Sequence, residues 1–201
     1  MNQTLLYCFR KIHHYLLSRS KFDIHSPFVY KIYSQILKDK TDYPEYHRQI
    51  ENPTKRKMTL SDNDLRLLFR LAKYFKPKTT LIAGTMDEIS ASFLASGFPG
   101  TCINYIHDGT GLTTESGMFD MVFVSVDLPG NHIRDYFSQI MQHIHNDSVL
   151  IICNINVSKE MHELWKEIKN HSSVTVTIDL FTLGLVFSKG ELTKEDFILR
   201  Y

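Results

Sequence analysis

Residues that could bind a ligand or move a proton follow the short apolar runs of the chain's second half: Gly84, Thr85, Asp108, Asp127 and His132. If those runs are parallel strands, their carboxyl ends meet at one edge, where open α/β sheets bind ligands. A strand, a glycine turn and a helix around Gly84 are typical of a nucleotide-binding fold. His132 is the best candidate general base, and its alternative role is a local hydrogen bond at a helix start.

The other chemistry-bearing residues predict neither a metal site nor a catalytic nucleophile. His143 and His145 are two positions apart, so on a helix their side chains face different directions. The three cysteines have no paired spacing, and Cys102 and Cys153 lie inside apolar runs; we expect both to be buried thiols. Trp165 has the spacing of a core residue on a helix.

The composition indicates one globular domain with no bulk charge. Lys and Arg number 23 against 22 Asp and Glu, and 43% of the 201 residues are hydrophobic. A net charge of +1 favours neither nucleic acid nor an acidic membrane surface. No run approaches the ~20 apolar residues that a membrane span needs. We therefore expect a cytoplasmic protein that binds neither membranes nor nucleic acid.

Three helices are predicted before residue 78. The first carries an apolar stripe at helical spacing, made of Leu5, Cys8, Phe9, Ile12, Tyr15 and Leu16. Ser26 and Pro27 begin a second, and Ser61 with Asp64 three residues later forms a capping-box pattern for a third. We expect residues 1–60 to form a helical extension packed on a core formed by 61–201.

From residue 79 onward, apolar runs alternate with helical patterns. The predicted strands are 80–83, 102–106, 121–126 and 149–152, and the predicted helices are 89–96, 133–145 and 159–171. Apolar strands separated by helices indicate a parallel sheet covered on both faces. The alternating run 174–178 and the run 183–187 predict an antiparallel pair. The fold class is therefore α/β, doubly wound, with a mostly parallel sheet ending in a hairpin.

Four segments carry a resemblance over nearly the whole chain: 25–29 (HSPFV), 67–71 (LLFRL) leading into 76–77, 129–132 (PGNH), and 158–165 with 178–181 (IDLF). With the strand–glycine–helix unit, they resemble the class I S-adenosylmethionine-dependent methyltransferases, and more specifically a small bacterial branch with an N-terminal helical extension. The resemblance implies a Rossmann-like methyltransferase fold and S-adenosylmethionine as the cofactor.

The implied cofactor positions depart from the family pattern. Gly84, Thr85 and Met86 occupy the glycine-rich turn, but no second or third glycine follows, and Ile82 stands at the acidic position of the first strand. Side chains thus stand where the backbone should approach the ligand. Asp108 is near the ribose-binding position, although its surroundings are equally typical of a turn.

A third departure is a deletion. Between the second and fourth strands the family inserts a helix, a strand and a helix, but residues 109–119 here number only 11. One βαβ crossover alone needs about 10–12 residues. The third strand and its flanking helices are therefore predicted to be absent, which puts the second strand at the sheet edge.

The family's metal-using members place acids after the fourth and fifth strands. Here Cys153 and Asn154 stand where the resembling branch has an acidic pair, and Ser125 or Asp127 follows the fourth strand. One carboxylate and one amide are too few hard ligands, so no metal is expected.

These features predict a methyltransferase-like pseudoenzyme that has lost most cofactor binding and acts through a homo-oligomer or a partner protein. One alternative is an active methyltransferase of O-methyltransferase type, with Gly84, Thr85 and Asp108 at the cofactor and His132 or Asp127 at the acceptor. Another is a small-molecule binding domain that keeps the cleft for a different ligand.

Overall fold

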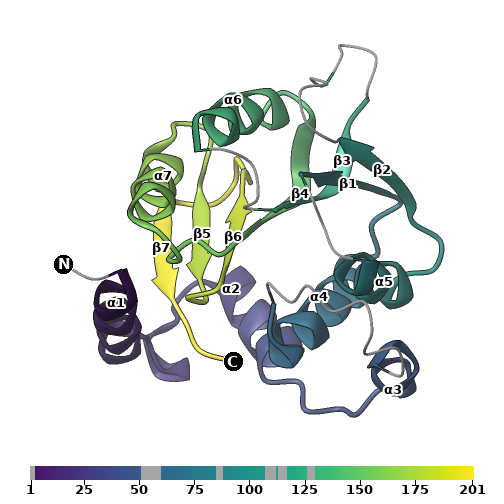
Figure 1. The fold of residues 1–201 in the computed structure, drawn as a ribbon, viewed down its shortest axis with the longest axis horizontal. Helices are drawn as coiled ribbons and strands as arrows, with labels where there is room; N and C mark the ends of the chain where they lie inside the picture. Colours follow the sequence, from purple (N-terminus) through teal and green to yellow (C-terminus); the bar gives the residue numbers. More distant parts are fainter. Residues whose placement is uncertain (1–2, 51–59, 85–87, 107–111, 113–116, 126–129) are drawn as a thin grey trace.

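The computed structural model describes residues 3–50, 60–84, 88–106, 112, 117–125 and 130–201, and its centre is a twisted β-sheet flanked by helices (Figure 1). The strands are β1 Thr79–Ala83, β2 Cys102–Ile106, β3 Phe119–Val124, β4 Ile144–Cys153, β5 Val176–Asp179, β6 Leu183–Phe187 and β7 Glu195–Ile198. The α-helices are α1 Gln3–Leu17, α2 Pro27–Ile32, α3 Pro44–Ile50, α4 Asp62–Phe75, α5 Glu88–Gly97, α6 Gly130–Ile140 and α7 Lys159–Asn170. A 3₁₀ turn, η1, covers Lys21–Asp23, and a π-helical turn, η2 Tyr33–Leu37, continues α2.

The strand order in the described residues is β2-β1-β3-β4-β6-β5-β7. Strands β1 to β4 are parallel, whereas β6 runs antiparallel to both β4 and β5. The predicted antiparallel pair is therefore confirmed. Strand β7, which pairs parallel with β5, was not predicted, because its four residues, EDFI, carry too weak an apolar pattern.

Successive strand residues point into two separate cores, as a doubly wound sheet requires. Ile82 and Phe123 face α4, α5 and α2, whereas Leu81 and Val122 face α6 and α7. Figure 1 shows these two sets of helices on opposite sides of the sheet. The predicted α/β architecture is confirmed. No helix in the described part of the chain combines the length and the hydropathy that spanning a bilayer requires.

Both predicted helix caps form. The Ser26 hydroxyl accepts a hydrogen bond from the backbone N–H of Val29, with Pro27 in the first turn. Ser61 and Asp64 make the reciprocal capping box of α4, which satisfies two N–H groups that the helix itself leaves unpaired. The caps therefore fix where these two helices begin.

Helix α1 forms as predicted, but its apolar stripe faces outward. Leu5, Phe9, Ile12 and Leu16 are between 52% and 74% exposed. The opposite face contacts the rest of the protein, and Arg10 there donates to the carbonyl oxygens of residues 156 and 158 at 3.1 and 2.8 Å. The helix is thus amphipathic with its apolar side turned away from the core.

Strand β2 lies at one end of the sheet, as the short connection predicts, and the described residues that follow β2 in the sequence form no strand before β3. The prediction that Cys102 is buried is wrong: its side chain is exposed, whereas Cys153 is buried as expected. The reason is the edge position, which leaves most of β2 uncovered.

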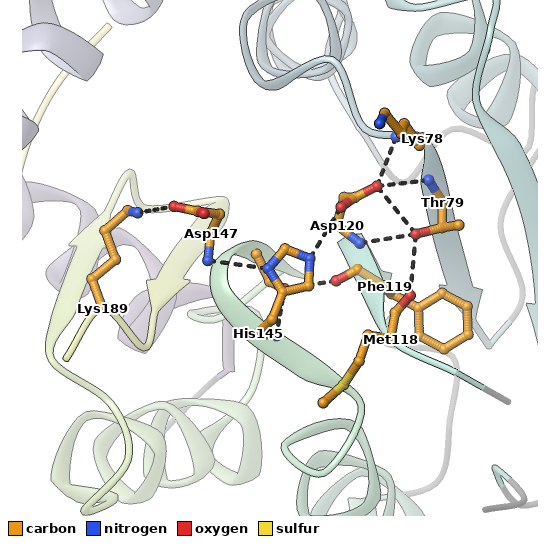
Figure 2. A network of polar contacts seen from close by, with 9 residues as sticks. Lys78, Thr79, Met118, Phe119, Asp120, His145, Asp147 and Lys189 are labelled. Carbon is orange, nitrogen blue, oxygen red and sulfur yellow. Dashed lines mark hydrogen bonds and ion pairs between the residues drawn. The ribbon is translucent and has the colours of Figure 1, made fainter. Parts of the chain in front are cut away.

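Helix α6 ends at Ile140, five residues before the predicted end, because residues 144 and 145 already belong to β4. His145 instead enters a network at the amino ends of β1, β3 and β4 (Figure 2). Its Nδ1 accepts from the Asp147 N–H at 3.2 Å, which leaves Nε2 to donate to Asp120 Oδ1 at 3.0 Å. Asp120 Oδ2 accepts from the backbone N–H groups of Lys78 and Thr79 at 2.7 and 2.9 Å. The network therefore links the amino ends of β1, β3 and β4 through side-chain hydrogen bonds.

We predict that Asp120→Asn lowers the free energy of unfolding by about 1–2 kcal/mol at pH 7, because an amide cannot accept every donor that the carboxylate holds. Although partial burial alone would raise the pKa of Asp120, hydrogen bonds from Thr79, His145 and Lys78 hold that pKa below its usual range. A lowered folded-state pKa stabilises the protein above about pH 4, and the effect is lost as the pH falls through the folded value. Urea unfolding of the wild type and the variant at pH 7 and pH 3 measures the loss of stability and its dependence on pH.

Asp135→Asn on the exposed surface of α6 is the matched control and should change stability by less than about 0.5 kcal/mol. An equal loss in both variants, or a difference for Asp120→Asn that is as large at pH 3 as at pH 7, would contradict this account.

Gly184 lies within β6, and the Trp165 ring fills the space beside it. A Cβ there would lie 2.7 Å from two ring carbons of Trp165. We predict that Gly184→Ala lowers the free energy of unfolding by about 1–3 kcal/mol through overpacking, measured by Trp165 fluorescence during urea unfolding. Gly190→Ala has its closest contact at 3.8 Å and serves as the control. Equal stability of the two variants would show that the core has room.

Candidate functional site

Strands β1, β3 and β4 end at the same edge of the sheet, where Gly84, Ser125 and Asn154 follow them. The backbone N–H of Ser125 donates to Ala83 O at 2.9 Å, and that of Gly84 donates to Ile106 O at 3.0 Å. The strand ends are thereby fixed relative to one another. This carboxyl edge is where ligands bind in doubly wound sheets.

The turn after β1 retains one feature of a nucleotide site and lacks another. Gly84 has φ +91°, a conformation that glycine adopts without strain, as expected for a tight turn. Ile82, at the family's acidic position, is completely buried against the α4 and α5 side of the sheet. A buried alkyl side chain cannot accept a hydrogen bond from a ligand.

Most of the other predicted site residues lie outside the described residues: Thr85, Met86, Asp108 and Asp127. His132 lies in the first turn of α6, but its side chain is also outside the described part. Their arrangement, and the catalytic or binding roles assigned to them, therefore stay predictions.

At the end of β4, Asn154 has φ +55° and Cys153 points into the core. The Cys153 thiol is buried, and the Asn154 amide oxygen is one candidate ligand for a hard metal ion. Among the described residues, no three His, Cys, Asp or Glu side chains gather where a metal ion could bind.

A cavity of about 440 Å³ lies beside Asn154 at the carboxyl edge. Its wall comes from α1, the start of α4, the turn between β5 and β6, and the C-terminal residues 199–201. The volume is in the range of small-molecule sites. Its polar lining residues include Tyr7, Lys11, His14, Ser61, Asp64 and Tyr201.

Asp64 is the buried centre of this wall, only 2% exposed. One carboxylate oxygen accepts from the N–H and hydroxyl of Ser61, and the other accepts from the Tyr201 hydroxyl. Burial, together with the neighbouring Asp64 charge, raises the pKa of Tyr201 far above its usual range. The phenol therefore stays protonated and acts as a donor, which makes the pair a fixed wall rather than a proton acceptor.

His14 and Asp179 attach α1 beside the cavity. Nε2 of His14 lies 3.0 Å from Asp179 Oδ1, and Asp179 Oδ2 accepts from Trp165 Nε1 at 3.1 Å. Phe181, with φ +73°, packs edge-on against the rings of Tyr7 and His14. Trp165 is buried, as predicted. The chain from His14 to Trp165 links α1 to the core through side chains.

The sequence pattern did not predict the part that Tyr201, His14 and Asp179 play at this edge. Tyr201 lies 137 positions from Asp64 and His14 lies 165 positions from Asp179. No local spacing connects residues so far apart. The Ser61–Asp64 pattern was the only available signal, and it predicted a helix cap rather than a cavity wall.

Solved structures share this architecture at low sequence identity. Rv0187 from MTB, in a cofactor-bound form, is 14% identical, with 74% of this chain and 91% of that chain covered and a TM-score of 0.57. The O-methyltransferase TomG from Streptomyces achromogenes, in complex with SAM, is 18% identical over 80% and 96% of the two chains, with a TM-score of 0.52. The SAH-bound methyltransferase PaMTH1 from Podospora anserina is 12% identical over 83% and 97%, with a TM-score of 0.54.

No protein-family model and no curated protein matches the sequence. At these identities the structural likeness establishes the fold. The chain has the Rossmann-like fold of the class I S-adenosylmethionine-dependent methyltransferases.

Proposed function

We propose that this is a methyltransferase-like protein with a degenerate cofactor site, impaired in catalysis, that acts by self-association through α1. The observation that carries the proposal is the apolar face of α1, formed by Leu5, Phe9, Ile12 and Leu16 and exposed to solvent. Three features support it: Ile82 in β1 in place of an acid, the exposed edge strand β2, and the helical spacing of the apolar residues on α1.

Strands β1 and β2 carry the features that weaken the cofactor site. SAM or SAH is present in the TomG and PaMTH1 structures, so SAM is the natural candidate ligand for this fold. Here Ile82 removes an acidic contact, and at the edge strand Tyr105 is 51% exposed. The family's third strand and its helices would lie beyond that strand. Without them one side of the adenine pocket has no wall, which weakens binding.

Helix α1 carries the surface for self-association. Its four outward apolar residues are spaced 4, 3 and 4 positions apart, as on the seam of a helix pair. Exposed apolar patches of this kind are typical of protein-contact surfaces. The stripe can pair with the same stripe of a second copy about a two-fold axis, as in most homodimers. A helix of 15 residues is only about 22 Å long, so we expect a weak dimer in the micromolar range.

A second candidate function, methyl transfer with a divergent pocket, is favoured by the cavity beside Asn154 at the acceptor side of the sheet. It would use Gly84, Thr85 and Asp108 for SAM, with Asp127 or His132 at the acceptor. This alternative predicts cofactor in the purified protein and loss of binding in Asp108→Ala.

We predict that isothermal titration with SAM or SAH gives no binding heat up to about 1 mM ligand, because Ile82 and the missing wall remove contacts that the ligand needs. An active class I methyltransferase titrated with the same stocks is the positive control, and a cooperative thermal melt establishes that the test protein is folded. Micromolar binding of either ligand would contradict the degenerate site and favour methyl transfer.

We also predict that the wild-type chain sediments as a reversible dimer at about 100 µM and that Phe9→Ser with Ile12→Ser makes it monomeric. The two substitutions remove the centre of the exposed stripe without touching the Arg10 and His14 contacts. Met118→Ser with Val157→Ser, which removes two exposed apolar groups elsewhere, should leave the dimer intact. A monomeric wild type, or equal effects in both double variants, would refute self-association through α1.

A further inference from the structure

A second cavity of about 440 Å³ lies between the end of η2 and one face of α4, and its wall is strongly basic. Lys38 and Lys40 come from the segment after η2, and Arg66 and Arg70 come from α4. The two arginines are four positions apart and therefore share one face of the helix. Tyr201 is shared with the cavity beside Asn154, but its hydroxyl is already bonded to Asp64.

The positive charge in this cavity is poorly balanced. Within the described part of the chain, none of the four cations forms an ion pair with an acidic side chain. Asp39 is the acid of the wall, and its two carboxylate oxygens accept from Thr41 N–H and Tyr43 OH at 2.9 and 2.8 Å. Its charge acts on Arg70, whose Nη1 donates to the Asp39 backbone carbonyl, so one acid faces four cations. Burial and the like charges of Arg200 and Lys40 lower the pKa of Lys38, as expected where cations gather without an anion.

Three buried donors in the wall have no acceptor: the Tyr46 hydroxyl and the Nε–H groups of Arg66 and Arg70. Tyr46 is only 2% exposed, and burial raises its pKa to about 12, so the hydroxyl carries its proton at neutral pH. The Arg66 guanidinium lies over the Tyr46 ring, 5.1 Å from its centroid. Buried polar groups are nearly always hydrogen-bonded in folded proteins, so three donors without a protein partner, all on residues that line one cavity, favour an acceptor bound there.

We propose that this cavity binds a phosphate group, either inorganic phosphate or the monoester of a small organic molecule. A phosphate offers several acceptor oxygens and a double negative charge, which suits paired guanidinium groups better than a single carboxylate does. The cavity volume exceeds that of the phosphate alone and leaves room for an attached group such as a nucleoside. The protein's net charge of +1 favours a small ligand over a nucleic acid strand.

The test is isothermal titration of the full chain at low ionic strength with inorganic phosphate, adenosine 5′-monophosphate and adenosine. We expect both phosphate compounds to bind and adenosine not to bind. Tighter binding of the monophosphate identifies a monoester site, and equal binding of the two identifies a site for the phosphate group itself. Either result supports the proposal. Absence of binding by both phosphate compounds at millimolar concentration would overturn it.

Variants locate the site. Arg66→Gln with Arg70→Gln should weaken phosphate binding at least tenfold. Lys73→Gln, which removes a charge from the exposed surface of the same helix, should change it less than twofold. Equal effects of the two changes would indicate non-specific attraction and overturn the proposal. An oligonucleotide that binds over a hundredfold more tightly than the monophosphate would overturn the small ligand in favour of nucleic acid.

Tyr46→Phe provides a readout that does not depend on the arginines. It removes a hydroxyl that has no partner in the free protein, so the thermal midpoint without ligand should stay the same or rise. Binding of the monophosphate should nevertheless weaken about five- to tenfold, because one hydrogen bond to a charged acceptor is lost. A lower midpoint with unchanged binding would show that the hydroxyl serves the fold, and would contradict its place in the site.

Discussion

The short connection from β2 to β3 constrains the rest of the molecule. Residues 107–118 separate β2 from β3 in the sequence, and β1 lies between the two strands in the sheet, whose order is β2-β1-β3. A crossover of that length has no room for an additional strand with its helices. Strand β2 therefore ends the sheet, and its exposed residues follow from that position. The described residues place no further strand beyond β2.

The rest of the fold is intact despite this loss. Two apolar cores cover both faces of the sheet, and the Asp120 network joins the amino ends of β1, β3 and β4. Two polar anchors attach α1: Arg10 donates to backbone carbonyls, and His14 pairs with Asp179. The two cavities described above lie against α1 and α4, one beside Asp64 and the other beside Arg66. The binding surfaces we propose thus lie on the helical layer and not in the turn after β1.

Local patterns predicted what local interactions determine. Ser61 and Asp64 are three residues apart and their mutual hydrogen bonds begin α4, so the sequence alone was sufficient. The direction in which α1 faces depends on His14 meeting Asp179 across the molecule, and the stripe of α1 looks the same whether it is buried or exposed. Cys102 was predicted wrongly because an apolar run does not reveal an uncovered edge. The cavity lined by Arg66 and Arg70 also needs Tyr46 and Lys38, which come from other segments. No regular spacing in the sequence links these residues to the two arginines.

The central claim is that the space beyond Gly84 no longer holds S-adenosylmethionine or its product. A crystal structure grown in several millimolar S-adenosylhomocysteine tests that claim most directly. The account predicts no ligand density between the Gly84 turn, the end of β2 and Ser125, with Ile82 buried as described. Density for the complete ligand in that space, with an acidic side chain on its ribose hydroxyls, would contradict it.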